Sequence, residues 1–298
     1  MIKISPKKII IGTVKFGIPN YGLNNNNSNK DFSDFLLQSF HLGVNQLDTA
    51  ERYGQSEKII GSFIKKNQIE YNVSTKIDNL KHNDSQSFRI VKKSILSSLK
   101  KLNTEKIHIC YLHQNDISII LDNYIQEALL ELKEKKLIQY IGASIYTVDE
   151  CNAAIESKVY DFIQIPINII DTSIYDSCVL NYQGNVKFIA RSIYLQGLLT
   201  NPNQQHKINN FNKEIFDYLN EIKIIGDEVG ISLSDLSRSF VYNLNNIESY
   251  IIGTTSLNNL KNNFFKYDFT KDLNLFNKIY SKSRIKKSWS NPRNWVIN

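Results

Sequence analysis

Short hydrophobic runs alternate with longer stretches of mixed polarity along almost the whole chain of 298 residues. The runs are rich in Ile, Val and aromatic residues, which favour β-strands. In the longer stretches apolar residues recur every three or four positions, as in an amphipathic helix, most clearly over Asp84–Leu102 and Asn123–Lys136. The runs predict eight strands: Lys8–Gly12, Asn45–Leu47, Tyr71–Thr75, Ile107–Leu112, Ile138–Ala143, Phe162–Ile165, Val186–Ala190 and Tyr250–Ile252.

The regular alternation of strand and helix predicts an α/β fold with a parallel sheet. Eight such units in a chain of this length favour a closed (β/α)8 TIM barrel, while periodicity alone leaves a doubly wound open sheet as the alternative. No linker rich in Pro, Gly or Ser divides the pattern, so we expect a single domain over residues 1–298, with residues 268–298 as a C-terminal helix and tail. The weakest unit is Asp171–Tyr182, where helical periodicity is poor.

Composition narrows the class of protein. With 42% hydrophobic residues the chain can bury a full core, and no apolar run is long enough for a signal peptide or a membrane span. We therefore expect a soluble, cytoplasmic protein with no membrane partner. The three cysteines are widely spaced and lack a nearby histidine cluster, so we expect reduced thiols and no metal site.

The net charge of +7 indicates a general preference for anionic ligands. The basic residues are spread along the chain and form no single arm, so nucleic-acid binding is not expected. The densest basic run, Lys282–Lys287, is interpreted as a solvated helix end. The Asn-rich segment at 24–29 is interpreted as an exposed loop.

Chemically reactive side chains follow the predicted strands directly. Asp48, Lys76 and His113 end the second, third and fourth strands, and Tyr53 lies in the loop after Asp48. In a barrel the carboxyl ends of all strands meet at one rim, which is where catalytic groups stand. Each residue alone has an ordinary explanation as a cap, a packed aromatic, a surface charge or a core histidine. Their shared position at consecutive strand ends favours a joint site.

This set of side chains contains what carbonyl reduction needs besides a hydride donor. A free Tyr, with a pKa of about 10, is a poor acid near neutral pH unless its phenolate is stabilised. We expect Lys76 to lower the pKa of Tyr53, Asp48 to keep Lys76 charged, and His113 to donate to the substrate carbonyl or relay a proton. A lyase or isomerase that uses Tyr53, Lys76 and His113 for proton transfer alone is the alternative.

Several motifs between residues 8 and 265 resemble the aldo-keto reductases. The segment Leu47–Gly54 carries the specific pattern Asp-Thr-Ala-x-x-Tyr-Gly, and the order of the other motifs along the chain agrees with it. The further matching segments are Gly12–Gly17, Tyr21 with Gly22, Ser56 with Glu57, Gly61, Ser74–Lys76, Tyr111–His113 and Ile141–Ser144.

The resemblance implies an NAD(P)(H)-dependent oxidoreductase that interconverts a carbonyl and an alcohol. Asp48, Tyr53, Lys76 and His113 match the family's catalytic set, with Tyr53 as general acid and base. Because some relatives serve as redox-sensing regulatory subunits, such a role without turnover is the non-enzymatic alternative. The complete catalytic set weighs against it.

The resemblance also implies a cofactor site for NADP(H) or NAD(H). Ser144 and Gln164 match residues that bind the nicotinamide carboxamide, while Arg191 replaces an aromatic found in many members and offers a guanidinium that can stack in its place. The segment from Gly253 to Leu260 resembles the helix start that receives the adenosine phosphate, yet it contains no Lys or Arg, which leaves the choice of cofactor open. The full expected cofactor set is Thr13, Val14, Asp48, Ser144, Gln164, Arg191, Ser192, Gly197, Leu198, Gly253, Thr254, Thr255, Asn259 and Asn263.

The expected partner is a small-molecule carbonyl substrate. The stretch Ser192–Gly197 looks most like bacterial members among sugar-modifying enzymes, which favours a sugar or nucleotide sugar. The tail after the last helix is expected to fold back near the substrate mouth, with Trp289 and Trp295 either contacting substrate or packing on the barrel.

Overall fold

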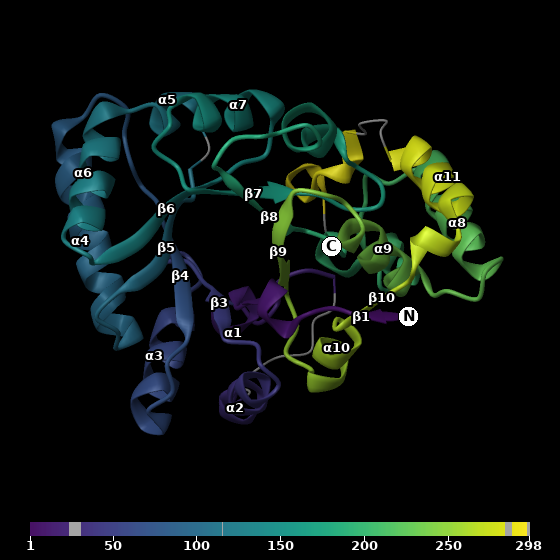
Figure 1. Cartoon of the computed structure of the whole chain (residues 1–298), viewed down its shortest axis with the longest axis horizontal. Coiled ribbons are helices and arrows are strands. Elements are labelled where there is room, and N and C mark those ends of the chain that lie inside the picture. Colours follow the sequence, from purple (N-terminus) through teal and green to yellow (C-terminus); the bar gives the residue numbers. More distant parts are fainter. Residues whose placement is uncertain (24–30, 115, 284–287, 297–298) are drawn as a thin grey trace.

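A computed structural model describes residues 1–23, 31–114, 116–283 and 288–296. Its centre is a closed barrel of eight parallel strands, in which each strand pairs with the next along the chain and the last pairs with the first (Figure 1). This confirms the single-domain barrel and excludes the open sheet. The strands are β2 (Ile9–Gly12), β3 (Gln46–Asp48), β4 (Asn72–Ile77), β5 (Ile107–Leu112), β6 (Ile138–Ser144), β7 (Phe162–Pro166), β8 (Lys187–Arg191) and β9 (Ile247–Ile252).

The strands are buried on both faces because helices cover the outside of the barrel and side chains fill the inside. In β5, Ile109 and Tyr111 point to the barrel interior, while Cys110 and Leu112 belong to the larger core between strands and helices. This alternation follows from the two-residue period of a strand. The interior cluster consists of Ile10, Ile109, Tyr111, Phe162 and Ile189.

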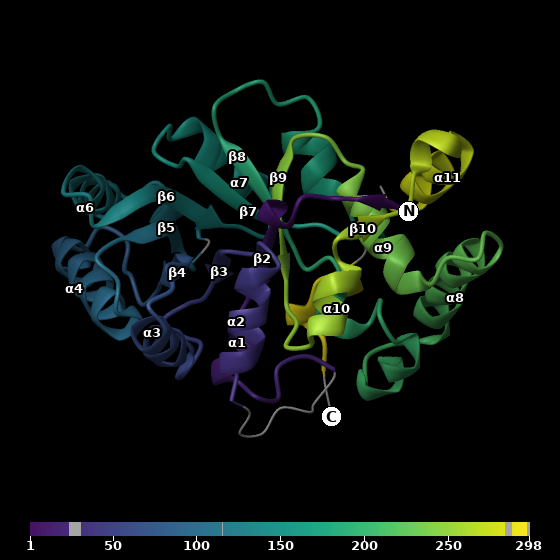
Figure 2. The same cartoon turned by 60° about the horizontal axis from the view of Figure 1, so that its bottom comes forward.

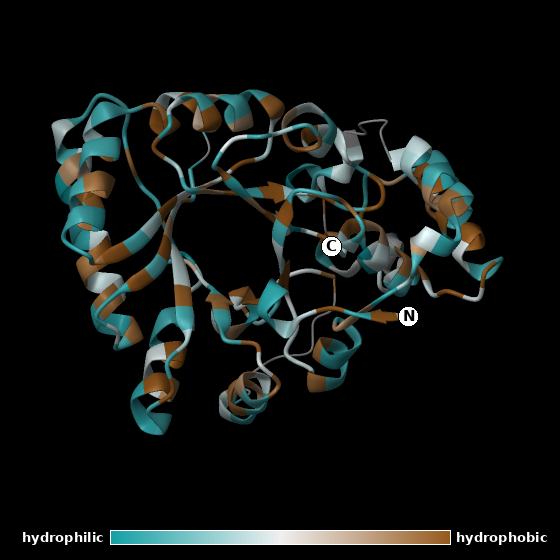
Figure 3. Ribbon diagram, in the orientation of Figure 1, coloured by the Kyte–Doolittle hydropathy of each residue, from teal (hydrophilic) through white to brown (hydrophobic). Residues whose placement is uncertain are grey.

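The helices surround the barrel, as Figure 2 shows from a second direction. In α4, Asp84 caps the first turn by accepting from the backbone N–H of Gln86, a contact worth about 1 kcal/mol, and Asn103 ends the helix in the left-handed region. Figure 3 shows hydrophobic and hydrophilic residues on opposite sides of such helices. The longer helices are α2 (Ser33–His41), α3 (Ser56–Asn67), α4 (Ser85–Leu102), α6 (Asn123–Glu134), α7 (Val148–Glu156), α8 (Lys213–Asp227), α9 (Leu233–Tyr242) and α11 (Leu273–Ser283).

Short elements complete the chain. They are α1 (Val14–Gly17), α5 (Ile117–Ile120), α10 (Leu257–Asn262), the π-helical turn η2 (Tyr175–Val179), the 3-10 turns η1 (Pro6–Lys8), η3 (Leu195–Gly197), η4 (Pro202–Lys207), η5 (Phe269–Lys271), η6 (Ser288–Ser290) and η7 (Pro292–Asn294), and the antiparallel pair β1 (Ile2–Lys3) with β10 (Phe265–Lys266). The sequence did not predict β1 and β10, because two-residue strands carry no period. The poor periodicity of Asp171–Tyr182 agrees with a π-helical turn at that place.

The chain end packs on the outside of the barrel. Helix α11 lies beside α8 in Figure 1, and Lys282 Nζ is 2.7 Å from Glu221 Oε2. Residues 284–287 of the basic run and the Asn-rich segment at 24–29 lie outside the described residues. Within the described part of the chain, every helix is too short or too polar to cross a membrane.

Candidate active site

A cavity of about 710 Å³ opens at the carboxyl ends of the barrel strands. One end of it is lined by Asp48, Tyr53, Lys76 and His113, and the lining continues past β9 to α10. The volume lies in the range of ligand and cofactor pockets. The four residues expected to act together are therefore brought to one place.

A buried ion pair lies at the centre of this group. Lys76 Nζ donates to Asp48 Oδ1 and to the carbonyl oxygen of Thr49, the latter at 2.9 Å. The ammonium is also 5.0 Å from the centroid of the Tyr53 ring, and the rings of Tyr53 and His113 meet edge to face at 5.9 Å. The position of Lys76 between carboxylate and phenol is the arrangement the sequence predicted.

Close backbone packing fixes the loop that carries Tyr53. A Cβ on Gly17 would lie 1.6 Å from the Tyr53 carbonyl oxygen, and Gly54 adopts a φ of +54° directly after the tyrosine. The hydroxyl of Ser56 donates to Thr13 Oγ1 at 2.9 Å, which ties the start of α3 to the loop after β2. The two glycines of the family motifs are thus needed for the close approach of these loops.

Burial and charge set the protonation states of the group. Burial, followed by the charge of Asp48, raises the pKa of Tyr53 above its usual value, and Arg191 opposes this. The net shift is opposite to the lowering that the sequence led us to expect. Burial lowers the pKa of Lys76, and Asp48 opposes the shift. Burial first, then the cations Lys76, Arg52, Arg191 and Arg293, lower the pKa of His113 to about 3.

These shifts predict the pH dependence of carbonyl reduction. A proton donor works only while protonated, so a raised pKa of Tyr53 keeps reduction active until the pH passes that value, above about 10. His113 stays neutral above about pH 3. We expect kcat/KM for reduction to be flat between about pH 5 and 9, measured with a neutral aldehyde. A limb near pH 6.5, the ordinary value for His, would contradict the neutral state of His113.

Asp78 is a site residue that the sequence reasoning missed. It follows β4 directly, is buried, and its Oδ2 lies 3.5 Å from His113 Nδ1 and 2.7 Å from Arg52 Nε. Asp78 Oδ2 therefore forms an ion pair with Arg52, while His113 Nδ1 is buried without a hydrogen-bond partner among the described residues. Asp78 could have been identified from the sequence, because it follows Lys76 by two positions at the end of the same strand.

Ser144, the last residue of β6, pairs in register with Gln164 in the middle of β7. Gln164 Nε2 donates to Asp48 Oδ2 at 2.6 Å, and the same side chain interacts with the buried hydroxyl of Tyr111, although its Oε1 makes no direct hydrogen bond in the described part of the chain. A buried acceptor without a donor is rare in proteins and fits a ligand that supplies one. The N–H₂ of a nicotinamide carboxamide is such a donor.

Most of the remaining residues expected to bind the cofactor line the cavity. Thr13 and Val14 line the cavity, as do Arg191, Ser192 and Gly197. Leu198 does not belong to this lining. Its side chain is fully buried in the main core and its backbone N–H donates to the carbonyl oxygen of Leu195.

The far end of the cavity is lined by Gly253, Thr254, Thr255, Asn259 and Asn263. No atom lies within 4 Å of a Cβ placed on Gly253, so the backbone there is open to a ligand.

Two residues of α9 that sequence reasoning missed, Asp235 and Arg238, line this far end as well. Arg238 is 2% exposed and donates to Asp235 Oδ1 and to the Phe265 carbonyl oxygen, both at 2.6 Å. Arg238 could have been identified from the sequence, because it is a charged residue in the buried stripe of α9.

Comparison with known proteins identifies the family. The Aldo/keto reductase family matches over residues 8–284. The chain belongs to the aldo/keto reductase family. It is therefore an oxidoreductase, in agreement with the resemblance found in the sequence motifs.

Relatives of this aldo/keto reductase are distant. An uncharacterized oxidoreductase of Bacillus subtilis is 26% identical over 276 residues, covering 86% of this chain and 90% of the relative. L-galactose dehydrogenase of Arabidopsis thaliana is 28% identical over 178 residues, covering 55% of this chain and 56% of that enzyme. An aldo-keto reductase of Bacillus halodurans, solved in its holo form, has the same fold with a TM-score of 0.71 at 17% identity, covering 95% of both chains.

The tail of the reductase reaches the cavity wall through Arg293. Its guanidinium carbon is 3.3 Å from the ring centroid of Tyr146, a cavity-lining residue. Trp295 is buried and donates to the carbonyl oxygen of Trp289, and both rings pack against Phe211 at 5.7 Å between centroids. The tryptophans therefore have the packing role, while an arginine approaches the site.

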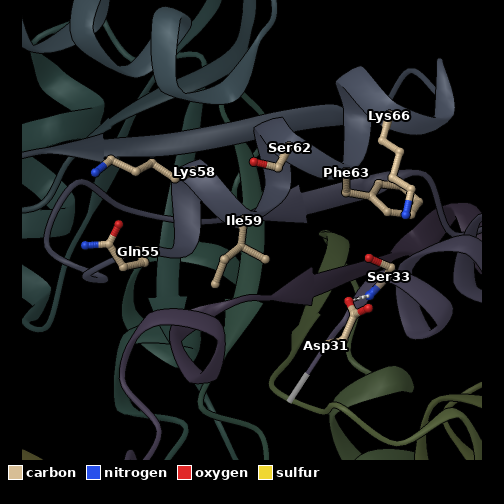
Figure 4. A pocket seen from close by; sticks show the side chains of 8 residues that line it. All are labelled: Asp31, Ser33, Gln55, Lys58, Ile59, Ser62, Phe63 and Lys66. Atoms are coloured by element: carbon tan, nitrogen blue, oxygen red, sulfur yellow. Dashed lines mark hydrogen bonds between the residues drawn. The ribbon is translucent and has the colours of Figure 1, made fainter. Parts of the chain in front are cut away.

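A second hollow, of about 500 Å³, lies outside the barrel of the reductase (Figure 4). Lys58 and Lys66 of α3 line it from one side, and Asp31 and Ser33 from the other. Its lining includes none of the strand-end residues that form the catalytic group. We therefore place the chemistry in the larger cavity.

Proposed function

We propose that this protein interconverts a carbonyl, in an aldehyde, ketone or sugar-derived compound, and an alcohol, using NADP(H) or NAD(H). The single observation that carries the proposal is the buried Lys76–Asp48 pair beside the Tyr53 phenol, in a cavity of about 710 Å³. A bound nicotinamide would supply the hydride or accept it.

In reduction Tyr53 protonates the oxygen of the carbonyl as it becomes an alkoxide. Its raised pKa keeps the proton available until charge develops on the substrate. The ammonium of Lys76 then stabilises the negative charge that forms on the phenol, and Asp48 holds this ammonium in place. His113, kept neutral, orients the carbonyl by a hydrogen bond. In oxidation the same groups act in reverse, with Tyr53 as base.

The cofactor-binding residues follow from the cavity lining. Gln164 and Ser144 would hold the carboxamide, and Thr254, Thr255 and Asn259 the adenosine end. The match to the aldo/keto reductase family disfavours a lyase or isomerase that transfers protons without a nicotinamide. A regulatory subunit without turnover would not need the complete catalytic group.

A sugar-related substrate is part of the proposal. It is supported by the partial similarity to L-galactose dehydrogenase and by the polar lining of the cavity mouth. We place the enzyme in the cytoplasm, since its three cysteines are buried free thiols, as reducing compartments favour. No nucleic-acid or membrane partner is proposed.

The function is tested by turnover of a panel of aldehydes, ketoses and nucleotide sugars with NADPH and NADH, followed by cofactor absorbance. We expect oxidation of at least one cofactor in the presence of a carbonyl substrate. Tight cofactor binding with no turnover on any substrate would favour the regulatory alternative. No cofactor binding at all would favour proton-transfer chemistry.

Cofactor preference is expected to be weak. A cation that reads a 2′-phosphate contributes about 1.5–3 kcal/mol, roughly one to two decades in affinity. Arg238 is already bound to Asp235 and to the Phe265 carbonyl, and Gly253–Leu260 contains no base. We therefore predict that NADPH binds less than about a hundredfold more tightly than NADH.

The Asn259→Arg variant should shift this preference toward NADPH, measured as dissociation constants by fluorescence titration. Asp235→Asn should shift it in the same direction, because it releases Arg238 from its carboxylate partner. A wild-type preference of a thousandfold for NADPH would show that a cation elsewhere, such as Lys261, reads the phosphate.

A further inference from the structure

Two of the three cysteines lie together where helix α7 packs on the π-helical turn η2. Cys151 belongs to α7 and Cys178 to η2. The sulfur of Cys178 is 3.4 Å from Asn152 Oδ1 and 3.8 Å from the carbonyl oxygen of Val148. Asn152 follows Cys151 directly, and Val148 begins the same helix. Cys178 therefore lies against the turn of α7 that carries Cys151.

The two thiols also form a hydrogen bond with each other, in which Cys151 donates to Cys178. This bond is the largest cause of a lowered pKa of Cys178 and of a raised pKa of Cys151, because it stabilises the acceptor as a thiolate and keeps the proton on the donor. Burial and the charge of Asp149 oppose the shift at Cys178, and burial adds to the shift at Cys151. The thiolate of the pair is thus favoured at Cys178.

The exposure of the two sulfur-bearing residues differs in the same direction. Cys151 is fully buried, whereas Cys178 is 8% exposed and follows the exposed Ser177. Cysteines react with oxidants where thiolate character is combined with access from solvent. A small oxidant would therefore reach Cys178 first, with the Cys151 thiol beside it as the second reactant.

The proposed carbonyl chemistry makes no use of this pair, since neither thiol belongs to the lining of the larger cavity. The third cysteine, Cys110, differs from both. It is fully buried in β5, and burial raises the pKa of its thiol. Cys110 is therefore an internal reference for a thiol that should not react.

We propose that Cys151 and Cys178 form a redox-active site that hydrogen peroxide converts reversibly to a disulfide between α7 and η2. The Cys178 thiolate attacks one peroxide oxygen, the O–O bond breaks, and the other oxygen leaves as water after taking up a proton, so that Cys178 becomes a sulfenic acid. The Cys151 thiol then attacks the sulfenic sulfur, whose S–O bond breaks, and a second water leaves. Two thiols are thus oxidised by two electrons, which reduce one peroxide to two waters.

The test exposes the reduced protein to hydrogen peroxide, with glutathione treated in parallel as an exposed reference thiol. Free thiols are then counted after denaturation. We expect the count to fall from three to one, because two of the three thiols are consumed, and dithiothreitol should restore it. Peptide mapping without reduction should join Cys151 to Cys178 within one molecule and show Cys110 as a free thiol.

Three variants separate the two steps of the reaction. Cys151→Ala should stop it at the sulfenic acid of Cys178, which dimedone traps. Cys178→Ser should abolish the oxidation of Cys151, because the thiol that reacts first is missing. Cys110→Ala is the matched control and should form the disulfide as the unaltered protein does.

Three results would overturn this inference. They are three free thiols after a treatment that oxidises glutathione, a disulfide that joins other cysteines or two molecules, and oxidation of Cys178 that forms no disulfide in the unaltered protein. The peptide map of the unaltered protein decides the question even where a variant fails to fold. None of these measurements uses turnover, so the absence of carbonyl reduction would contradict the proposed function and leave the redox-active site standing.

Discussion

Replacing Tyr53 with Phe is expected to lower kcat for carbonyl reduction by about 10²–10⁴-fold, the usual contribution of a positioned proton donor. The substitution removes only the hydroxyl. The ring would keep its contact with His113 and its place beside Lys76. Cofactor dissociation constants should therefore change little, and the loss should appear in kcat measured at saturating cofactor and aldehyde.

Tyr21→Phe is the matched control for this variant. Tyr21 is a second phenol in the cavity lining, and burial raises its pKa to about 12. We expect Tyr21→Phe to retain most of the activity, because this tyrosine has no direct contact with the Lys76 ammonium among the described interactions. Activity near the wild-type level in Tyr53→Phe, or a severe loss in Tyr21→Phe alone, would move the proton donor to another residue.

Replacing Lys76 with Met is expected to affect both stability and activity. The Lys76 and Asp48 side chains are 3% and 6% exposed, and removing one partner of a buried ion pair costs about 3–5 kcal/mol, because the remaining charge is buried alone. The free energy of unfolding, measured by urea denaturation, should fall by that amount. Its residual activity should be severely reduced, and the apparent pKa of Tyr53 should rise further, since a nearby cation is lost.

The double variant Asp48→Asn/Lys76→Met separates the two effects. Removing both charges should recover most of the free energy of unfolding, while activity stays low because the phenol still lacks its cation. Recovery of activity together with stability would show that Lys76 acts only through folding. Wild-type stability of the single Lys76→Met variant would contradict the buried pair.

The barrel could be predicted because its signals are local. Runs such as Ile107–Leu112 and Ile138–Ala143 combine β-branched residues with a defined length, and both coincide with β5 and β6 to within one residue. Strand β9 begins at Ile247, three residues before the predicted start, because Glu248 breaks the apolar run although Ile247 and Ser249 on either side of it pair with β8. Hydrogen bonding of the backbone is not visible in hydropathy.

The site was predictable as far as it depends on strand ends. Asp48, Lys76 and His113 each follow a clear strand, so the barrel fold alone places them together. Arg293 approaches the cavity wall from a distant segment whose sequence carries no such signal, so it was not expected there, whereas Arg238 could have been found from its place in the buried stripe of α9. The direction of the Tyr53 pKa shift was also wrong. The sequence shows that Lys76 ends the strand after Tyr53, but it does not show how deeply the Tyr53 phenol is buried.

The most direct test of the proposed chemistry is to follow the hydride itself. The enzyme would be supplied with NADPH or NADH carrying deuterium at both C4 positions of the nicotinamide, together with an aldehyde it turns over. We predict that one deuterium appears on the carbinol carbon of the product alcohol, detected by mass spectrometry and proton NMR. An alcohol product without deuterium, or turnover of substrate in the absence of any nicotinamide cofactor, would contradict hydride transfer.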